Sequence, residues 1–367
     1  MYSEREEFLI WLSCFELSWK KREEILSKVK TLDDFRSAVD FGKTNLTDGE
    51  IFNLQNASTK TFLSMHLESL KKAQVFCITQ ASADYPQSLY NIPEPPHCLY
   101  CVGKKELLKH KCIAIVGTRQ ATRYGKTVAE KFAKELSDAG FVIVSGLADG
   151  IDTAGHSGVM QDYLNNADFS SPALTIAVLG GGFNYFYPKS NLALFNQMAK
   201  HSLVISEYAP NVASHPFHFP YRNRIVVGLS KGVVVPEAGE KSGTSHTVEY
   251  ALNSGIDVFA VPGQINSPAS LGTNRLIKSA QGMCVTNVTD ILEHFGVNRK
   301  EQPKKAIQLD ADEQLIINAL AEGDLHIDQL IEKTKLDIKK LNNLLTKLTM
   351  NGILVKLTGN YYEISDN

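Results

Sequence analysis

The stretch Lys111-Cys112-Ile113-Ala114-Ile115-Val116-Gly117-Thr118-Arg119 decides the fold. Residues 113–116 form a short apolar run rich in β-branched side chains, which is typical of a strand buried on both faces. Gly117 ends the run, and residues 125–139 then carry apolar side chains at helical spacing. A strand, a glycine turn and a helix open a parallel α/β unit, whose ligands bind at the carboxyl ends of the strands. Arg119 carries a planar guanidinium that suits phosphate, so the stretch predicts an anion site.

Buried strands alternate with helices beyond this stretch, which predicts a doubly wound, mostly parallel sheet with right-handed crossovers. The expected strands span residues 113–116, 141–145, 175–179, 203–206, 232–235 and 258–261. The expected helices span residues 125–139, 152–161, 191–200, 244–254 and 271–280. We interpret residues 73–296 as one extended Rossmann-like α/β domain, with two further short strands at residues 75–78 and 98–102.

The segments on either side of this domain have a different pattern. Residues 1–72 are predicted to be helical, with a capping box from Thr47 to Glu50, and form a small SAM-like domain whose expected role is packing or docking. Residues 297–308 contain several lysines and read as a basic linker. Residues 309–367 predict three helices followed by two strands around Gly359-Asn360, which resembles a winged-helix domain.

The composition limits the possible functions. The chain of 367 residues has 38 Lys and Arg against 40 Asp and Glu, so any nucleic-acid binding must come from a local patch. The acidic first residues do not resemble a signal peptide, and no apolar run is long enough to cross a bilayer, so a cytoplasmic protein is expected. Cys98 and Cys101 form a C-x-x-C in an expected strand, which would point the two thiols to opposite faces and disfavours a metal site.

Several loops at the expected strand ends combine glycine, hydroxyl and cationic side chains. Arg119, Lys189, Arg222, Arg224 and Lys241 can together neutralise several phosphates. Lys241 is followed by Ser242 and Gly243 at a predicted helix start, where backbone N–H groups bind anions. Aromatic residues lie in the same loops and can stack on unpaired bases: Phe183, Tyr185, Phe186, Tyr187, Phe217 and Phe219. The alternative is that each arginine pairs with a carboxylate and that the aromatic side chains belong to the core.

Four patterns that imitate other chemistries are incomplete. Residues 120–127 end like a nucleotide-binding P-loop but begin with Gln120 in place of the required glycine. The glycines at 180–182 lack the third glycine of a dinucleotide fingerprint. Ser145, Asp152 and His156 are not accompanied by a nucleophile elbow, and the histidine pair 215 and 218 has no third metal ligand nearby. We therefore predict no catalytic residues, no metal and no cofactor.

The motifs together resemble those of the DNA-processing protein A (DprA/Smf) family. The resemblance covers about residues 75–292 and uses linked motifs, among them residues 113–119, 144–152, 219–225, 237–243 and 261–263. Thr118 stands where serine is common in the family, which keeps the hydroxyl. The helical and winged-helix-like flanks are also similar to those of longer members.

The resemblance implies a cytoplasmic, non-enzymatic homodimer that binds single-stranded DNA. It also implies that the protein loads the recombinase RecA on incoming DNA during natural transformation, and so acts in competence. Carried over by motif, the DNA-binding residues are Gly117, Thr118, Arg119, Lys189, Arg222, Asn223, Arg224, Lys241, Ser242 and Gly243. A nucleotide-processing enzyme of the phosphoribohydrolase type is the rival, although Ser245, His246 and Thr247 stand where its catalytic glutamate would follow. A third option is duplex DNA binding by the C-terminal domain through Lys339, Lys340 and Lys347.

Overall fold

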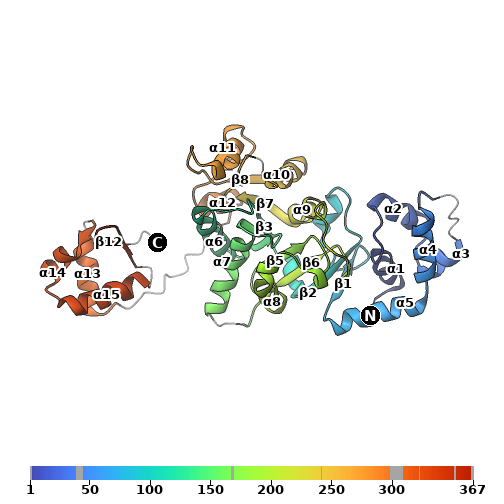
Figure 1. Cartoon of the computed structure of the whole chain (residues 1–367), viewed down its shortest axis with the longest axis horizontal. Helices are drawn as coiled ribbons and strands as arrows, with labels where there is room; N and C mark the ends of the chain where they lie inside the picture. The colour runs from blue at the N-terminus through green and yellow to red at the C-terminus, as the bar shows by residue number, and fades with distance from the viewer. Residues whose placement is uncertain are drawn as a thin grey trace. The chain divides into compact units, whose positions relative to one another are not determined.

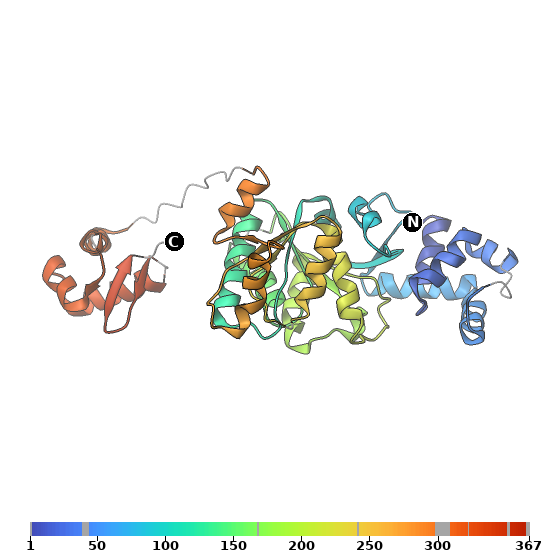
Figure 2. The ribbon, with the colours of Figure 1, turned by 90° about the horizontal axis from the view of Figure 1, so that it is seen from above.

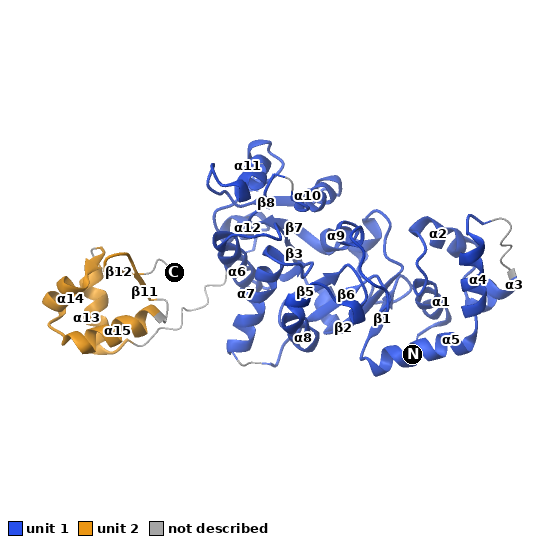
Figure 3. Cartoon of the chain, viewed as in Figure 1, with its two compact units in different colours: residues 1–299 blue, residues 300–367 orange. Residues whose placement is uncertain are grey.

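The computed structural model describes residues 2–38, 44–166, 169–240, 242–297, 309–321, 323–350 and 353–364. The chain forms two compact units, residues 1–299 and residues 300–367 (Figure 3). Most of the predicted linker at 297–308 lies outside the described residues. Within those residues, no helix combines the length and the apolar character that a membrane span requires.

The first unit is built on a nine-stranded sheet in the order β1-β2-β6-β5-β4-β3-β7-β8-β9. Its strands are β1 (Phe76–Thr79), β2 (Cys98–Gly103), β3 (Cys112–Ile115), β4 (Val142–Ser145), β5 (Thr175–Leu179), β6 (Leu203–Ser206), β7 (Ser230–Val235), β8 (Asp257–Ala260) and β9 (Met283–Cys284). The strands from β6 to β9 pair in parallel, whereas β2 pairs antiparallel with both β1 and β6. The expected parallel α/β sheet is therefore confirmed.

The order of the strands reverses between β3 and β7. From β3 the chain adds β4, β5 and β6 on one side, and it then returns to place β7 and β8 on the other side of β3. At such a point the loops leaving the two neighbouring strands diverge, which opens a crevice at their carboxyl ends. The topology thus places a potential binding site at the loop that follows Ile115.

Helices cover both faces of the sheet because each strand is apolar on both sides (Figures 1 and 2). One face packs on α6 (Arg123–Asp138), α7 (Ile151–Asn166), α8 (Leu192–His201) and α12 (Val288–His294). The opposite face packs on α9 (His218–Leu229), α10 (Thr244–Asn253) and the partly buried Leu276 of α11 (Leu271–Lys278). Short 3-10 helices join these elements: Gln87–Asn91, Lys105–Lys109, Phe183–Tyr185, Lys189–Asn191 and Pro268–Ser270.

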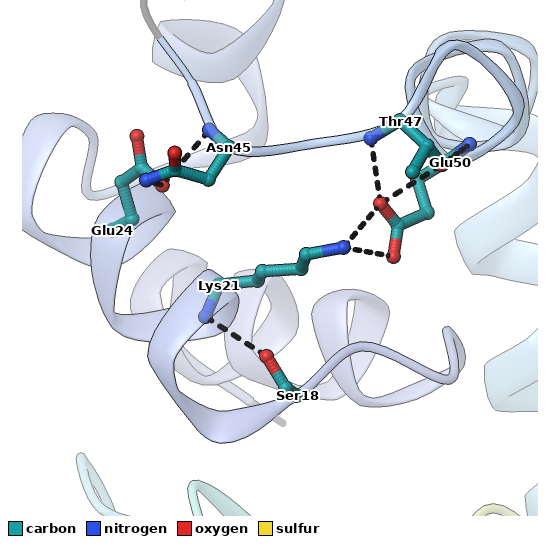
Figure 4. Close-up of polar contacts among 6 residues, drawn as sticks. All are labelled: Ser18, Lys21, Glu24, Asn45, Thr47 and Glu50. Carbon is teal, nitrogen blue, oxygen red and sulfur yellow. Dashed lines mark hydrogen bonds and ion pairs between the residues drawn. The ribbon is translucent and has the colours of Figure 1, made fainter.

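The N-terminal helices pack together, and the first and last of them also pack on the β1–β2 edge of the same unit. They are α1 (Glu4–Ser13), α2 (Trp19–Lys28), α3 (Leu32–Ala38), α4 (Asp48–Ala57) and α5 (Lys60–Lys72). Ile10 of α1 and Leu70 of α5 share an apolar cluster with Tyr100 of β2. The predicted capping box is present at Thr47, and Glu50 also forms an ion pair with Lys21 of α2 at 2.7 Å (Figure 4).

The strand β2 carries the C-x-x-C as predicted. Cys98 belongs to the apolar cluster beside the N-terminal helices, whereas Cys101 belongs to the cluster on the other face of the sheet. Both thiols are buried and free. The pair therefore fills space on opposite faces of a strand, as its alternation requires.

The second unit has the winged-helix arrangement expected from its sequence. Its elements are α13 (Ala311–Leu320), β10 (Leu325–His326), α14 (Ile327–Thr334), α15 (Ile338–Met350), β11 (Leu354–Lys356) and β12 (Tyr361–Ile364). Leu341, Leu345 and Leu348 of α15 fill the core of this unit. The turn between β11 and β12 has positive φ at Gly359 and Asn360, which are residues that tolerate this conformation.

Candidate nucleic-acid interface

A cleft of about 960 Å³ opens at the carboxyl ends of the parallel strands. It is lined from the loops after β3, β4, β5, β6 and β7 and from α9 and α10. Eight of the ten predicted contact residues line it: Gly117, Thr118, Arg119, Lys189, Arg222, Asn223, Ser242 and Gly243. The sheet therefore brings together residues that are far apart in the sequence.

The loop after β3 is held tightly at its start. A side-chain carbon on Gly117 would lie 2.5 Å from Cγ1 of Ile151, so only glycine allows this close approach. The Thr118 N–H donates to the backbone oxygen of Glu237, 2.9 Å away. Arg119 is exposed, and its guanidinium lies 5.2 Å from the centroid of the Phe219 ring. Its charge therefore faces the cleft beside an aromatic surface.

Arg222 forms a buried part of the cleft wall. Its side chain donates to the backbone oxygen of Gly146, which follows β4, at 2.8 Å, and to that of Val178 near the end of β5. Burial lowers the pKa of Arg222 to about 10, and the nearby Asp152 carboxylate opposes this shift. Burial likewise raises the pKa of Asp152, while Arg222 opposes it. Arg222 thus stays charged but is largely satisfied by the protein, so it organises the cleft more than it extends into it.

The start of α10 forms the wall opposite the β3 loop. The Ser242 hydroxyl accepts a hydrogen bond from the N–H of Thr244, the first residue of α10, at 3.2 Å. A side-chain carbon on Gly243 would meet no atom within 4 Å, so the backbone there is open to a ligand. Asn223 donates to the Thr247 hydroxyl at 2.8 Å and joins α9 to α10. A helix start of this kind favours anions.

Aromatic side chains lie along the same cleft. Tyr185, Phe186, Tyr187 and Phe219 line it, and Tyr185 and Tyr187 are 53% and 57% exposed. The Tyr187 and Phe219 ring centroids are 6.0 Å apart. Phe183 and Phe217 are outside the cleft lining; Phe217 stacks on His215 at the surface. The prediction of aromatic rings among the cations is therefore only partly correct.

The expectation that Arg224 lines the cleft is wrong. Its side chain is 1% exposed and forms two hydrogen bonds with the Glu207 carboxylate, at 2.7 and 2.8 Å. The segment that we read as a loop belongs to α9, and residues two positions apart on a helix differ by about 200° in direction. Arg222 and Arg224 therefore face opposite sides. The remaining predicted contact, Lys241, lies outside the described residues.

The residues of the hydrolase-like set lie close together, but among the described residues no hydrogen bond joins the Ser145 hydroxyl to the His156 ring. The Ser145 hydroxyl donates to the Ile115 oxygen at 2.6 Å, and His156 Nδ1 lies 2.7 Å from the Thr175 hydroxyl. His156 is fully buried, and burial lowers its pKa to about 3, so it is neutral near pH 7. Among the described residues, no group of three or more His, Cys, Asp and Glu side chains is placed to hold a metal ion.

The structure adds residues that we did not predict as contacts. Asp152 and Thr247 line the cleft between the predicted positions. Asp152 was visible within the motif at residues 144–152, but its raised pKa and its position beside Arg222 depend on packing across the sheet. Thr247 lies in the first turn of the helix that follows Ser242, three residues after Thr244, and helical spacing alone would have suggested it.

Comparison with protein families gives two matches along the chain. The model described as DNA recombination-mediator protein A matches residues 76–296, and the DprA winged helix domain matches residues 300–360. The DNA processing protein DprA of Bacillus subtilis is 40% identical over 230 residues, which cover 62% of this chain and 74% of the relative. Its counterpart in Streptococcus pneumoniae is 41% identical over 211 residues, or 58% of this chain and 71% of the relative.

Two solved structures share this fold. DNA processing protein A from Streptococcus pneumoniae superposes with a TM-score of 0.60 at 32% identity, covering 78% of this chain and 97% of the relative. The Helicobacter pylori protein, which is described as binding single-stranded DNA, gives a TM-score of 0.54 at 29% identity, covering 60% and 95%.

Proposed function

Because the chain belongs to the DNA recombination-mediator protein A family, we propose that its cleft binds single-stranded DNA as part of a DNA-processing role in recombination. The observation that carries the proposal is the convergence of Arg119, Lys189 and the start of α10 on one cleft that also holds exposed aromatic rings. Cations and backbone N–H groups bind a sugar-phosphate chain without reading its sequence.

The aromatic rings favour a single strand over a duplex. Tyr185 and Tyr187 are more than half exposed and line the cleft beside Phe219. Unpaired bases have free faces that stack on such rings, whereas the bases of a duplex are already stacked on one another. Binding through phosphate contacts also predicts that affinity falls as the salt concentration rises.

The direct test measures fluorescence anisotropy of labelled single-stranded and duplex oligonucleotides over a series of salt concentrations. We expect the chain to prefer the single strand, and Arg119→Ala to weaken that binding by about tenfold, the effect of losing one hydrogen bond to a charged group. Arg275→Ala is the matched control, because Arg275 is exposed on α11 and does not line the cleft. Equal binding by the wild type and Arg119→Ala would contradict this site.

We further propose that the bound strand is handed to the recombinase RecA during natural transformation, and that the active form is a homodimer. Both follow from the family resemblance and each has its own measurement. RecA assembly on single-stranded DNA covered by a single-strand-binding protein should be faster with the wild-type chain than with Arg119→Ala. Light scattering at several protein concentrations should give twice the mass of 40.6 kDa.

The rival function, cleavage of a nucleotide, predicts a different experimental result, the release of free base. A phosphoribohydrolase-type reaction needs a carboxylate close to the Ser242 loop, but Ser245, His246 and Thr247 follow it. Asp152 lines the cleft, yet it accepts the Gly146 N–H at 3.1 Å and lies beside Arg222. We expect no free base when the chain is incubated with nucleoside monophosphates; its release would favour the rival.

A further inference from the structure

A buried carboxylate lies directly behind the cleft. Glu237 follows β7 by two residues and is 1% exposed. It does not line the cleft, and it takes part in none of the ion pairs found in the part of the chain that the structure describes. An ionised carboxylate in such a position is costly unless hydrogen bonds and local dipoles stabilise it. Its surroundings therefore indicate what the residue does.

The side chain of Glu237 is held by one residue of the β3–α6 loop. Oε1 accepts the Thr122 hydroxyl at 2.6 Å, and Oε2 accepts the Thr122 N–H at 2.8 Å. The same hydroxyl accepts the Gly125 N–H at 3.2 Å and caps α6. The carboxylate thus lies at the start of α6, where the helix dipole favours a negative charge.

Two neighbouring features adapt the fold to this carboxylate. A side-chain carbon on Gly125 would lie 2.5 Å from Glu237 Oε2, so glycine leaves room for the oxygen. The backbone oxygen of Glu237 accepts the Thr118 N–H at 2.9 Å. Glu237 therefore binds the loop at Thr118 through its backbone and at Thr122 through its side chain. Arg119 lies between these two attachments.

We propose that Glu237 is a positioning residue of the cleft, which fixes the loop that presents Arg119 and makes no contact with DNA itself. This inference rests on the proposed function. The carboxylate also occupies the start of α6, and in related folds a nucleotide phosphate binds at such a helix start. The start of α10 lines the cleft and is open to a phosphate strand.

The test is a double-mutant cycle on single-stranded DNA affinity. Glu237→Gln keeps the size of the side chain but removes its charge and one acceptor, so the Thr122 contacts loosen. If Glu237 acts through Arg119, Glu237→Gln should weaken binding about tenfold in the wild type and have little effect in Arg119→Ala, because contacting residues in one network are not additive. A general loss of stability would instead give the same loss in both backgrounds.

The controls separate positioning from folding. Glu207→Gln changes a buried carboxylate that lies outside the cleft lining, and its effect should be the same with and without Arg119. Thr122→Ala and Thr122→Ser form a second pair of variants, which change the other partner of the contact between Glu237 and Thr122. Serine keeps both contacts to Glu237 and should bind like the wild type, whereas alanine should behave like Glu237→Gln, including its dependence on Arg119.

The outcomes are distinct. Failure of the wild-type chain to bind single-stranded DNA would remove the proposed function. If the wild type binds and Arg119→Ala weakens binding, but Glu237→Gln and Thr122→Ala cost the same in both backgrounds, only the positioning role is refuted. If Glu237→Gln does not fold, the Thr122→Ala and Thr122→Ser pair gives the answer.

Discussion

The cleft of the first unit and the third helix of the winged-helix unit both carry cations, but the cations differ in what they contact. Arg119 and Lys189 are exposed, line the cleft, and have no carboxylate partner among the ion pairs of the described residues. On α15, Lys340 pairs with Asp312 and Lys347 pairs with Glu313 at 2.7 Å, whereas Lys339 is exposed and belongs to none of the ion pairs of the described residues. The availability of a positive charge, rather than its presence in the sequence, decides whether it can bind phosphate.

The same contrast exists within the first unit, between Arg222 and Arg224. Arg222 reaches the cleft and holds the ends of two strands, while Arg224 is enclosed with Glu207. A buried pair of this kind contributes to the fold when both charges are present and destabilises it when one is removed. Replacing an exposed cation of the cleft should therefore weaken DNA binding, whereas disrupting a buried ion pair should destabilise the fold.

The largest effect should come from separating the buried pair. Glu207→Ala leaves the Arg224 charge enclosed without its partner, so we expect the free energy of unfolding to fall by about 3–5 kcal/mol. Urea denaturation measures this loss. The double variant Glu207→Gln, Arg224→Met removes both charges and should recover most of it. The folded variants should bind DNA normally; a selective loss of binding would mean that Arg224 belongs to the interface after all.

The next effect should come from the two exposed cations of the cleft. Arg119→Ala combined with Lys189→Ala should weaken single-stranded DNA binding by about 100-fold, since two hydrogen bonds from charged groups are lost. The slope of log affinity against log salt should become shallower by about 1.4, which corresponds to two phosphates on a single strand. Lys71→Ala with Lys72→Ala on α5 removes the same total charge outside the cleft lining and should change neither quantity.

His156 is a third titratable residue, and the fold keeps its ring neutral. Burial lowers the pKa of His156 to about 3 from its ordinary 6.5. The unfolded chain therefore takes up a proton below pH 6.5 that the folded chain does not, and the free energy of unfolding should fall as the pH decreases towards 3. The slope is about 1.4 kcal/mol per pH unit for one proton. His156→Asn can keep the contact with Thr175 and should flatten this slope.

Much of the sheet followed from local sequence. Strands β5 and β6 begin and end where we expected, because each is a continuous apolar run between polar turns. We did not predict the helix α9, because Pro220 and several aromatic residues made its first turn resemble a loop. Proline is tolerated in a first turn, where its missing N–H costs no hydrogen bond.

The convergence of the site was predictable, but the state of each charge was not. Parallel strands bring their carboxyl ends to one edge, so Gly117, Lys189 and Ser242 were expected to meet. Whether an arginine faces solvent or a carboxylate depends on which helix face is buried and on partners such as Glu207, which are distant in sequence. The role of Glu237 was not predicted for the same reason, because it depends on a contact with Thr122 in the loop after the neighbouring strand β3.

The smallest effects should come from the lysines of the winged-helix unit. Lys340→Ala removes an exposed charge whose partner, Asp312, is also partly exposed, and ion pairs of this kind contribute little to stability. Thermal unfolding and single-stranded DNA affinity should both stay close to the wild type. The more informative variant is Asp312→Asn, which removes the ion-pair partner of Lys340 and leaves the Lys340 charge available. If α15 contacts duplex DNA, Asp312→Asn should strengthen a duplex gel shift and Lys340→Ala should weaken it. An unchanged shift in both would assign duplex binding, if any is observed, to another surface.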